Sequence, residues 1–229
     1  MLKLILRSVG VVLFAFVALS VGAVLALRWV APPTTAFMLL DSSGRELEYR
    51  WVDAAEISVN LPYAVIAAED QKFPEHFGFD LESIRGAVDA YGDGERLRGA
   101  STITQQVAKN LFLWSGRSFV RKGLEAYFTL LLEVLLPKDR ILEIYLNIAE
   151  FGPGIYGVEA AGRAYFAKAA ARISDAEAAL LAAALPAPKK SSISRPSQYL
   201  RERQRWILTQ MHRLERDGAL ASLDMVARR

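Results

Sequence analysis

The chain has 229 residues, of which 52% are hydrophobic, and it carries a formal net charge of +3 at pH 7. This composition excludes a disordered protein and is sufficient for one sizeable core. The absence of cysteine excludes disulfides and thiolate catalysis, and the modest positive charge suits an anionic partner without requiring one.

The N-terminal segment has the features of a membrane anchor. Residues 8–27 contain no charge, and as a helix they would span roughly 30 Å, the thickness of a hydrocarbon core. Lys3 and Arg7 precede this stretch and only Arg28 follows closely, so the positive-inside rule places the N-terminus in the cytoplasm. A cleaved signal peptide is the alternative, but the apolar stretch is long for one and no clear small-x-small site follows it. We expect residues 1–30 to be a cytoplasmic N-terminus and anchor.

The rest of the chain is predicted to be mainly α-helical, with a juxtamembrane segment at 31–54 and one domain at 55–229. Within the juxtamembrane segment, residues 37–40 and 46–52 flank a turn signal and suggest a hairpin. Thr102 and Gln105 fit a capping box, and Pro137 ends a long apolar helix. Residues 92–99 have the composition of a polar loop. The predicted helices begin at Asn60 and otherwise cover about 81–91, 102–111, 119–136, 139–149, 158–166, 174–185 and 197–216.

Two adjacent carboxylates end the helix that begins at Asn60. Glu69 and Asp70 follow the apolar run YAVIAA, and a partly desolvated carboxylate has a raised pKa and is a better base. The alternative, which position alone favours, is that both carboxylates bond backbone groups or pair with Lys72. His76 has no partner at metal-ligand spacing, so a structural hydrogen bond is the simpler interpretation.

The stretch RGASTITQQVAKNLFL is richer in polar groups than a core helix needs. On a helix, Gln105 and Lys109 share one face, and Gln106 and Asn110 share another. Ser101 lies at the predicted N-terminus, where free amides can bind an anion. These groups suit sugar and phosphate oxygens, although a solvated face is the alternative.

A cationic stripe follows in RSFVRKGLEAYF. Arg117, Arg121 and Glu125 are spaced i, i+4, i+8, and Lys122 lies three residues before Glu125. An exposed salt bridge of little energetic weight is one interpretation. The other is a diphosphate site that stabilises charge on a leaving phosphate.

Together these stretches resemble the peptidoglycan glycosyltransferases, a lysozyme-like family that polymerises lipid II. Residues 69–80 match E-D-x-x-F-x-x-H-x-G-x-D, residues 99–110 match G-x-S-T-I-T-Q-Q-x-x-K-N, and residues 121–125 match R-K-x-x-E. Residues 141–166 and 179–190 are similar to the fourth and fifth family motifs. One departure is Gly99-Ala100, where the family usually has Gly-Gly.

The resemblance implies a mainly α, lysozyme-like glycosyltransferase domain behind one transmembrane helix. It implies that a glycan strand on undecaprenyl diphosphate is the donor and lipid II the acceptor. Glu69 would be the general base for the acceptor 4-hydroxyl, and Glu125 the second catalytic carboxylate, which orients the cations or holds a metal. Direct displacement would invert an α-linked donor into a β-1,4 strand. The expected substrate- and diphosphate-binding residues are Ser101, Gln105, Gln106, Lys109, Asn110, Arg117, Arg121 and Lys122, and the supporting residues are Asp70, Phe73 and His76.

The same resemblance sets the expected cofactors, partners and location. A divalent cation, Mg or Mn, at the diphosphate is left open, and no organic cofactor is expected. Expected partners are lipid II, the lipid-linked strand, the membrane and cell-wall synthesis or division proteins, with no nucleic acid. We expect a single-pass protein of the bacterial inner membrane with a periplasmic catalytic domain. Because the chain has no S-x-x-K serine, we expect a monofunctional enzyme without transpeptidase activity.

Two other functions compete with this prediction. A lysozyme-like hydrolase would need a general acid for a sugar leaving group and a route for water, and the cations near Glu125 argue against it. A non-catalytic wall-synthesis scaffold would not need both glutamates and the cationic cluster. The segment LFLW, residues 111–114, is predicted with equal weight to contact lipid or to pack in the core.

Overall fold

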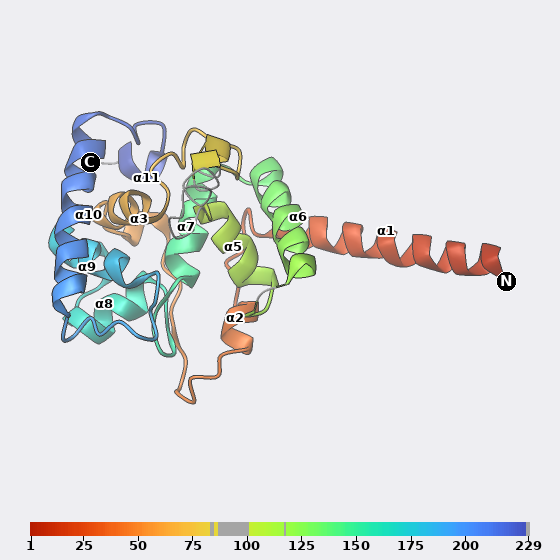
Figure 1. Cartoon of the computed structure of the whole chain (residues 1–229), viewed down its shortest axis with the longest axis horizontal. Helices are drawn as coiled ribbons and strands as arrows, with labels where there is room; N and C mark the ends of the chain where they lie inside the picture. Colours follow the sequence, from red (N-terminus) through yellow and green to blue (C-terminus); the bar gives the residue numbers. More distant parts are fainter. Residues whose placement is uncertain (83–84, 87–100, 117, 228–229) are drawn as a thin grey trace.

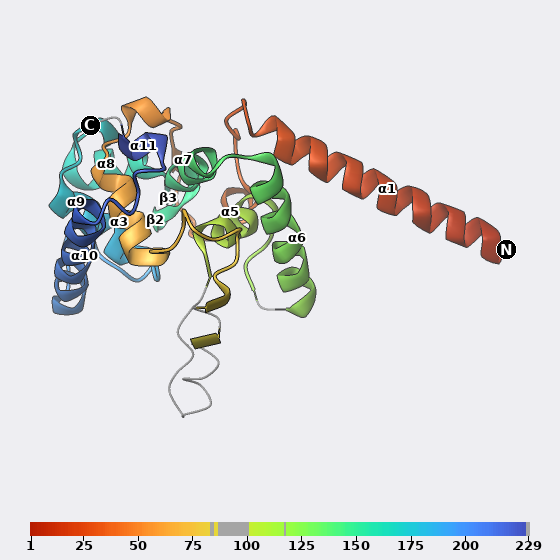
Figure 2. The ribbon, with the colours of Figure 1, turned by 90° about the horizontal axis from the view of Figure 1, so that it is seen from above.

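The computed structural model describes residues 1–82, 85–86, 101–116 and 118–227. One long helix, α1 (Leu2–Ala26), projects from a helical domain that holds the rest of the chain (Figures 1 and 2). Residues Lys3–Ala26 have a mean hydropathy of 2.7 and are long and apolar enough to cross a membrane by length and composition. The predicted apolar N-terminal helix is therefore confirmed.

The C-terminal end of α1 packs against α6 (Phe119–Leu135). The hydroxyls of Ser20 and Tyr127 lie 2.6 Å apart, and the rings of Phe16 and Tyr127 lie 5.7 Å apart. On the next turn, Val24 is fully buried. The last turns of α1 thus belong to the packed domain, while its earlier turns are exposed.

The domain is helical with one small sheet. The sheet has the order β1-β3-β2, with β1 (Glu48–Tyr49) parallel and β2 (Glu150–Gly152) antiparallel to β3 (Ile155–Tyr156). Short 3-10 helices cover Ala54–Glu56 and Ala170–Arg172. The other described helices are α2 (Ala36–Leu39), α3 (Asn60–Glu69), α5 (Ile103–Phe112), α7 (Lys138–Ile148), α8 (Val158–Phe166), α9 (Asp175–Ala184), α10 (Gln198–Arg216) and α11 (Asp224–Ala227).

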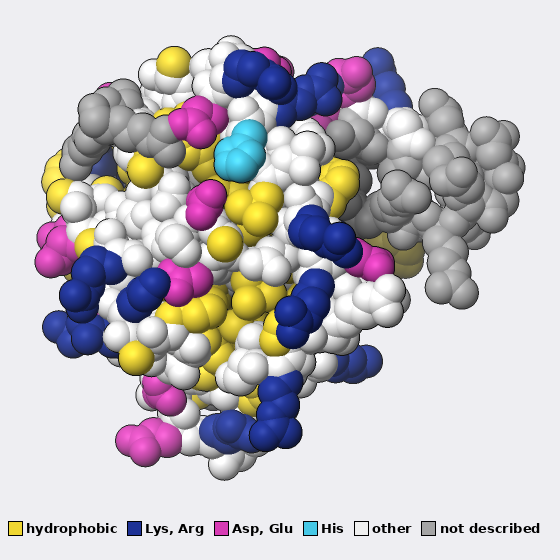
Figure 3. Space-filling model, turned by 90° about the vertical axis from the view of Figure 1, so that its left-hand side faces the viewer, with side chains coloured by type: hydrophobic (Ala, Val, Ile, Leu, Met, Phe, Trp, Pro, Cys, Tyr) yellow, Lys and Arg dark blue, Asp and Glu magenta, His cyan; other side chains and the backbone are white. Residues whose placement is uncertain are grey.

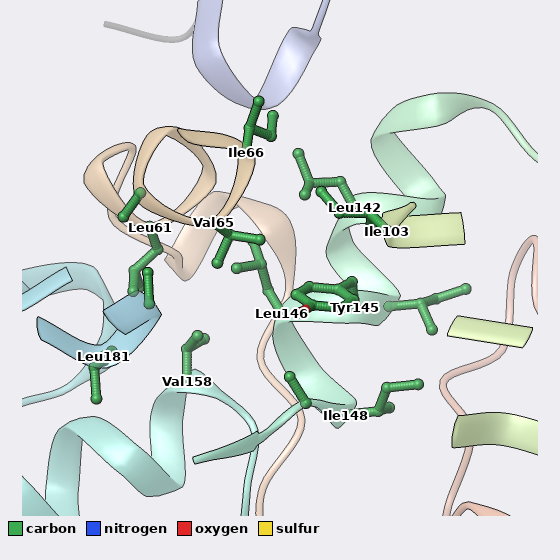
Figure 4. Close-up of a cluster of buried hydrophobic side chains, with 14 of the residues drawn as sticks. Leu61, Val65, Ile66, Ile103, Leu142, Tyr145, Leu146, Ile148, Val158 and Leu181 are labelled. Carbon is green, nitrogen blue, oxygen red and sulfur yellow. The ribbon is translucent and has the colours of Figure 1, made fainter. Parts of the chain in front are cut away.

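Helix α7 runs through the centre of the core. Every residue from 141 to 148 is buried, which explains why this segment is apolar on nearly all sides. Tyr145 and Leu146 of α7 lie among side chains from α3, α5, α8 and α9, including Val65 and Ile103 (Figure 4). This packing fixes α3 and α5, the two helices that carry most of the predicted site, against one common support.

The predicted helices from Asn60 onwards are confirmed where the structure describes them, but Asn60 is the first residue of α3 and not its cap, because its side chain donates to the Ile173 carbonyl. Thr102 and Gln105 form the capping box of α5, and Ser174 forms a second one with Glu177 at α9. The prediction of a helix over 81–91 lies largely outside the described residues.

The predicted hairpin between 37–40 and 46–52 is wrong. Residues 36–39 form α2, whose N-terminus is capped by the Thr35 side chain, and Glu48 pairs with Ile155 of the fourth motif instead. The turn residues are compatible with a local hairpin, but in the folded chain the backbone of β1 pairs with the distant strand β3. Met38 and Val52 also join the hydrophobic core, so this segment packs on the domain.

Candidate active site

Glu69, the last residue of α3, lies in a surface pocket of about 330 Å³. Segments distant in the chain close this pocket: the end of α3, the turn after it, the start of α5 and one side of α10. Its walls include Glu69, Asp70, Lys72, Asp80, Ser101 and Trp206.

The Glu69 carboxylate is held by two other helices. Gln106 Nε2 of α5 donates to Glu69 Oε2 at 2.9 Å, and Arg203 Nη2 of α10 lies 3.8 Å from Glu69 Oε1. The Tyr145 hydroxyl donates to Gln106 Oε1 at 3.1 Å, which fixes the amide orientation. Burial raises the pKa of Glu69, while Gln106, Arg203 and Lys109 act in the opposite direction. The outcome is a rigidly held carboxyl group with a raised pKa, as a general base requires.

Asp70 has a structural task. Its carboxylate accepts from the Ile103 amide at 2.9 Å and lies 2.8 Å from His76 Nε2. Asp70 therefore joins the turn after α3 to the first turn of α5, and the interpretation of Asp70 as a backbone partner is correct. His76 makes the expected structural hydrogen bond. Phe73 is fully buried, and the centroid of its ring lies 6.3 Å from that of the His76 imidazole. The proposed pairing with Lys72 is not found, because Lys72 pairs with Glu82.

The second predicted cluster is partly buried. Both oxygens of Glu125 are paired, Oε2 with Arg121 Nη1 at 2.8 Å and Oε1 with Lys122 Nζ. Glu125 is only 3% exposed, so the alternative of an ordinary exposed salt bridge is wrong. Arg121 Nε is buried and has no hydrogen-bond partner among the described residues.

Lys109 connects the two carboxylates electrostatically. Burial lowers its pKa, whereas the negative charges of Glu125 and Glu69 both favour its protonated form. The ammonium also lies 5.5 Å from the centroid of the Phe37 ring. Lys109 is therefore a largely desolvated cation between the Glu69 pocket and the Glu125 cluster.

The remaining predicted residues differ in accessibility. Gln105 is 5% exposed and its Oε1 accepts from the Thr102 amide, so it serves as a helix cap. Asn110 is also buried, whereas Ser101 is exposed at the pocket. Arg117 and the loop at 92–99 lie outside the described residues.

The described residues contain no group of three or more His, Asp or Glu side chains that could hold a metal ion. A cation beside Glu125 would have to share that carboxylate with Arg121 and Lys122 and take other ligands from a diphosphate. The residues alone do not build such a site, and a divalent-cation requirement stays a prediction.

Sequence reasoning missed the contribution of α10. Arg203 and Trp206 reach the Glu69 pocket from a helix that was predicted only as amphipathic. The one available signal was that Trp206 is an aromatic residue on a strongly charged helix, and its exposed fraction is 48%. For LFLW, Leu111 and Leu113 are buried, so they pack in the core.

The chain is similar to one protein family over most of its length. Residues 38–212 match the Transglycosylase family. A biosynthetic peptidoglycan transglycosylase of Pseudomonas entomophila (strain L48) is 50% identical over 98% of this chain and 98% of its own length. A protein of the same name from Shewanella frigidimarina (strain NCIMB 400) is 54% identical over 89% of this chain and 89% of its own length. Another from Xanthomonas campestris pv. campestris (strain B100) is 51% identical over 90% of this chain and 87% of its own length.

Proposed function

Since this chain belongs to the transglycosylase family and is a peptidoglycan glycosyltransferase, we propose that it polymerises lipid II with Glu69 as its general base. The single observation that carries this proposal is the arrangement of the two carboxylates. Glu69 is desolvated and held by Gln106 and Arg203, and the half-buried Lys109 interacts electrostatically with both Glu69 and Glu125 of the Arg121–Lys122–Glu125 cluster.

The acceptor is the lipid II molecule whose 4-hydroxyl enters the Glu69 pocket. As this oxygen attacks the donor anomeric carbon, its proton passes to the Glu69 carboxylate. The Gln106 bond and the nearby Arg203 favour the ionised form of Glu69 and so oppose the effect of burial, which raises its pKa. Attack opposite the leaving diphosphate inverts the anomeric centre, so an α-linked donor gives a β-1,4 bond.

The leaving group is undecaprenyl diphosphate, a weak base that needs charge stabilisation more than a proton. Arg121, Lys122 and Lys109 supply positive charge, and Glu125 holds the first two in place. In this assignment Glu125 orients cations and does not exchange protons with the substrate.

The membrane helix keeps the site near its lipid-linked substrates. With Lys3 and Arg7 before the span and Arg28 after it, we place the N-terminus in the cytoplasm and the domain in the periplasm. We further propose that the chain polymerises without cross-linking, because it contains no S-x-x-K serine.

The test is lipid II polymerisation by the detergent-solubilised full chain, beside Glu69→Gln and Glu125→Gln. Glu69→Gln is isosteric, and loss of a general base is expected to lower kcat by about 10²–10⁴-fold. Polymer from wild type and Glu69→Gln alike would remove Glu69 as the base. Soluble muropeptides released from purified sacculi, without polymer, would instead identify a hydrolase.

A further inference from the structure

Tyr145 is a polar residue in the apolar core that does not line the Glu69 pocket. Its side chain lies on α7 among Val65, Ile103 and Leu146 (Figure 4), and only 1% of its surface is exposed. A buried hydroxyl is costly unless it is hydrogen-bonded, and a phenylalanine would fill the same space without that cost. The position of this hydroxyl therefore calls for a reason other than packing.

The Tyr145 hydroxyl is joined to Glu69 through a single amide. It donates to Gln106 Oε1 at 3.1 Å, and Gln106 Nε2 donates to Glu69 Oε2 at 2.9 Å. The three side chains come from α7, α5 and α3, and they form a chain of two hydrogen bonds that runs from the core to the carboxylate. Because each bond in such a chain polarises the next, the hydroxyl strengthens the bond that the carboxylate receives.

The direction of both bonds follows from the protonation state of Tyr145. Burial raises the pKa of Tyr145 well above its ordinary value, and the charges of Glu69 and Asp70 act in the same direction. The hydroxyl is therefore protonated and needs an acceptor, which the amide oxygen of Gln106 supplies. An amide turned the other way would point its oxygen at the carboxylate and leave the Tyr145 proton without that acceptor.

The two ends of an amide distinguish between the two protonation states of a carboxyl group. An NH2 group donates most strongly to the ionised carboxylate, whereas an amide oxygen can bond only to the protonated acid. By holding the NH2 group toward Glu69, Tyr145 opposes the amide orientation that would stabilise the protonated acid. The protonated acid is the form that cannot act as a base.

The charged groups near Glu69 act on it directly and not through this amide. The charged side chains that face Glu69 or line its pocket are Asp70, Lys72, Asp80, Lys109 and Arg203. Lys109 and Arg203 favour the ionised carboxylate, and Asp70 opposes it. Farther away, on the side of the molecule where α10 lies, basic and acidic side chains are interspersed (Figure 3). Among the described residues, the Gln106 amide bonds Glu69 and Tyr145 alone, so Tyr145 sets its orientation.

We propose that Tyr145 is a positioning residue for Glu69, whose hydroxyl keeps the NH2 group of Gln106 directed at the carboxylate and so favours the ionised base. The consequence for catalysis rests on the proposed function, in which Glu69 accepts the proton of the acceptor hydroxyl. The orientation of the amide does not depend on that function and can be measured apart from it.

The first test is the pH profile of lipid II polymerisation by Tyr145→Phe, which removes the hydroxyl and keeps the ring. Activity is lost as the pH falls through the pKa of Glu69, and loss of the hydroxyl raises that pKa. The acid limb of kcat/KM should move to higher pH by about half to one pH unit, which corresponds to one hydrogen bond of ordinary net strength. Tyr156→Phe is the matched control, because Tyr156 is also 1% exposed and its hydroxyl donates to Asp41, which is not a wall of the pocket.

An NMR titration separates this inference from the proposed function. Carbon-13 spectra of the full chain follow the side-chain carboxyl of Glu69, whose signal is assigned by its loss in Glu69→Gln. The titration midpoint should rise in Tyr145→Phe and keep its wild-type value in Tyr156→Phe. It should also rise in Gln106→Met, and adding Tyr145→Phe should move it no further, because the hydroxyl acts through the amide.

An unmoved midpoint in Tyr145→Phe, or a further shift in the double variant, overturns the positioning role. A raised midpoint together with an unmoved acid limb would contradict Glu69 as the general base and leave the positioning role standing.

Discussion

The charge of Arg203 lowers the pKa of Glu69, and kinetics can detect the loss of this effect. Burial raises this pKa, and the Arg203 charge at 3.8 Å lowers it. Arg203→Met should therefore raise it further. Because the reaction needs ionised Glu69, activity is lost as the pH falls through this pKa. The acid limb of the kcat/KM profile should then move to higher pH in Arg203→Met.

A matched control for this prediction lies two residues along the same helix. Arg205 is exposed, so Arg205→Met removes the same charge from the chain without touching the pocket. Its pH profile should overlay that of wild type. An unmoved acid limb in Arg203→Met would mean that Arg203 does not act on the base.

Substitutions of Glu69 and Glu125, the two glutamates of the proposed site, should have opposite effects on stability. Ionised Glu69 is desolvated, with a raised folded-state pKa, so above that pKa its charge destabilises the fold, and Glu69→Gln should gain about 1 kcal/mol at pH 7. Glu125 neutralises Arg121 and Lys122. Glu125→Gln should lose about 2 kcal/mol, less than for a fully buried pair because Lys122 is half exposed. Thermal unfolding of both variants would check this, and a lower melting temperature for Glu69→Gln would contradict it.

At the scale of elements, the turn after α3 is fixed by close packing on α6. Gly78 has a φ of +77°, and an added Cβ would lie 2.7 Å from Thr129 Cγ2 and 2.9 Å from Glu133 Cγ. The Gly78 carbonyl also accepts from the Thr102 hydroxyl at 2.7 Å. The glycine of the first motif is therefore required by backbone conformation and by lack of space, and it holds α3, α5 and α6 together below the pocket.

Gly78→Ala should lower the free energy of unfolding by about 3 kcal/mol, from a strained φ and overpacking together. Gly44 has a similar φ of +69° with nothing within 4 Å of an added Cβ. Gly44→Ala should therefore cost only about 1 kcal/mol, the conformational part. Chemical denaturation of the two variants separates the cost of backbone strain from the cost of overpacking. Equal decreases in the free energy of unfolding would show that packing at Gly78 is not tight.

At the scale of the whole molecule, α1 and the helices of the proposed site form one packed unit. Phe16 of α1 lies 6.5 Å from Phe128 of α6, which stacks at 4.3 Å on Phe112 of α5. Helix α6 carries Glu125, and α5 carries Lys109. Helix α1 thus packs directly on α6 and is linked through Phe128 to α5, the two elements that hold the proposed diphosphate site.

Cysteine cross-linking can test this packing, because the chain has no cysteine of its own. Ser20→Cys with Tyr127→Cys should be joined by a short bifunctional maleimide, because the two native hydroxyls lie 2.6 Å apart and the length of the tyrosine ring leaves the two Cβ atoms too far apart for a direct disulfide. Val12→Cys with Tyr127→Cys is the control, because Val12 lies about two turns earlier and is 69% exposed. Equal cross-linking of both pairs would indicate that α1 is not docked at this position.

The sequence by itself predicted the helices, the cap of α5 and the candidate residues of the reaction. Helical periodicity, the Thr102–Gln105 capping box and the apolar N-terminal stretch are local patterns, and local patterns encode local structure. The order of the motifs likewise singled out Glu69 and Glu125, whose catalytic roles stay a prediction.

Only the tertiary structure decided which groups surround Glu69. Arg203 and Trp206 reach it from a helix far along the chain, and Asp70 turned out to bond the α5 backbone. The strand at Glu48–Tyr49 found its partner in the fourth motif and not in its neighbour. The physical reason is the same in each case. Contacts between distant segments depend on how whole helices pack around α7, and no short stretch of sequence contains that information.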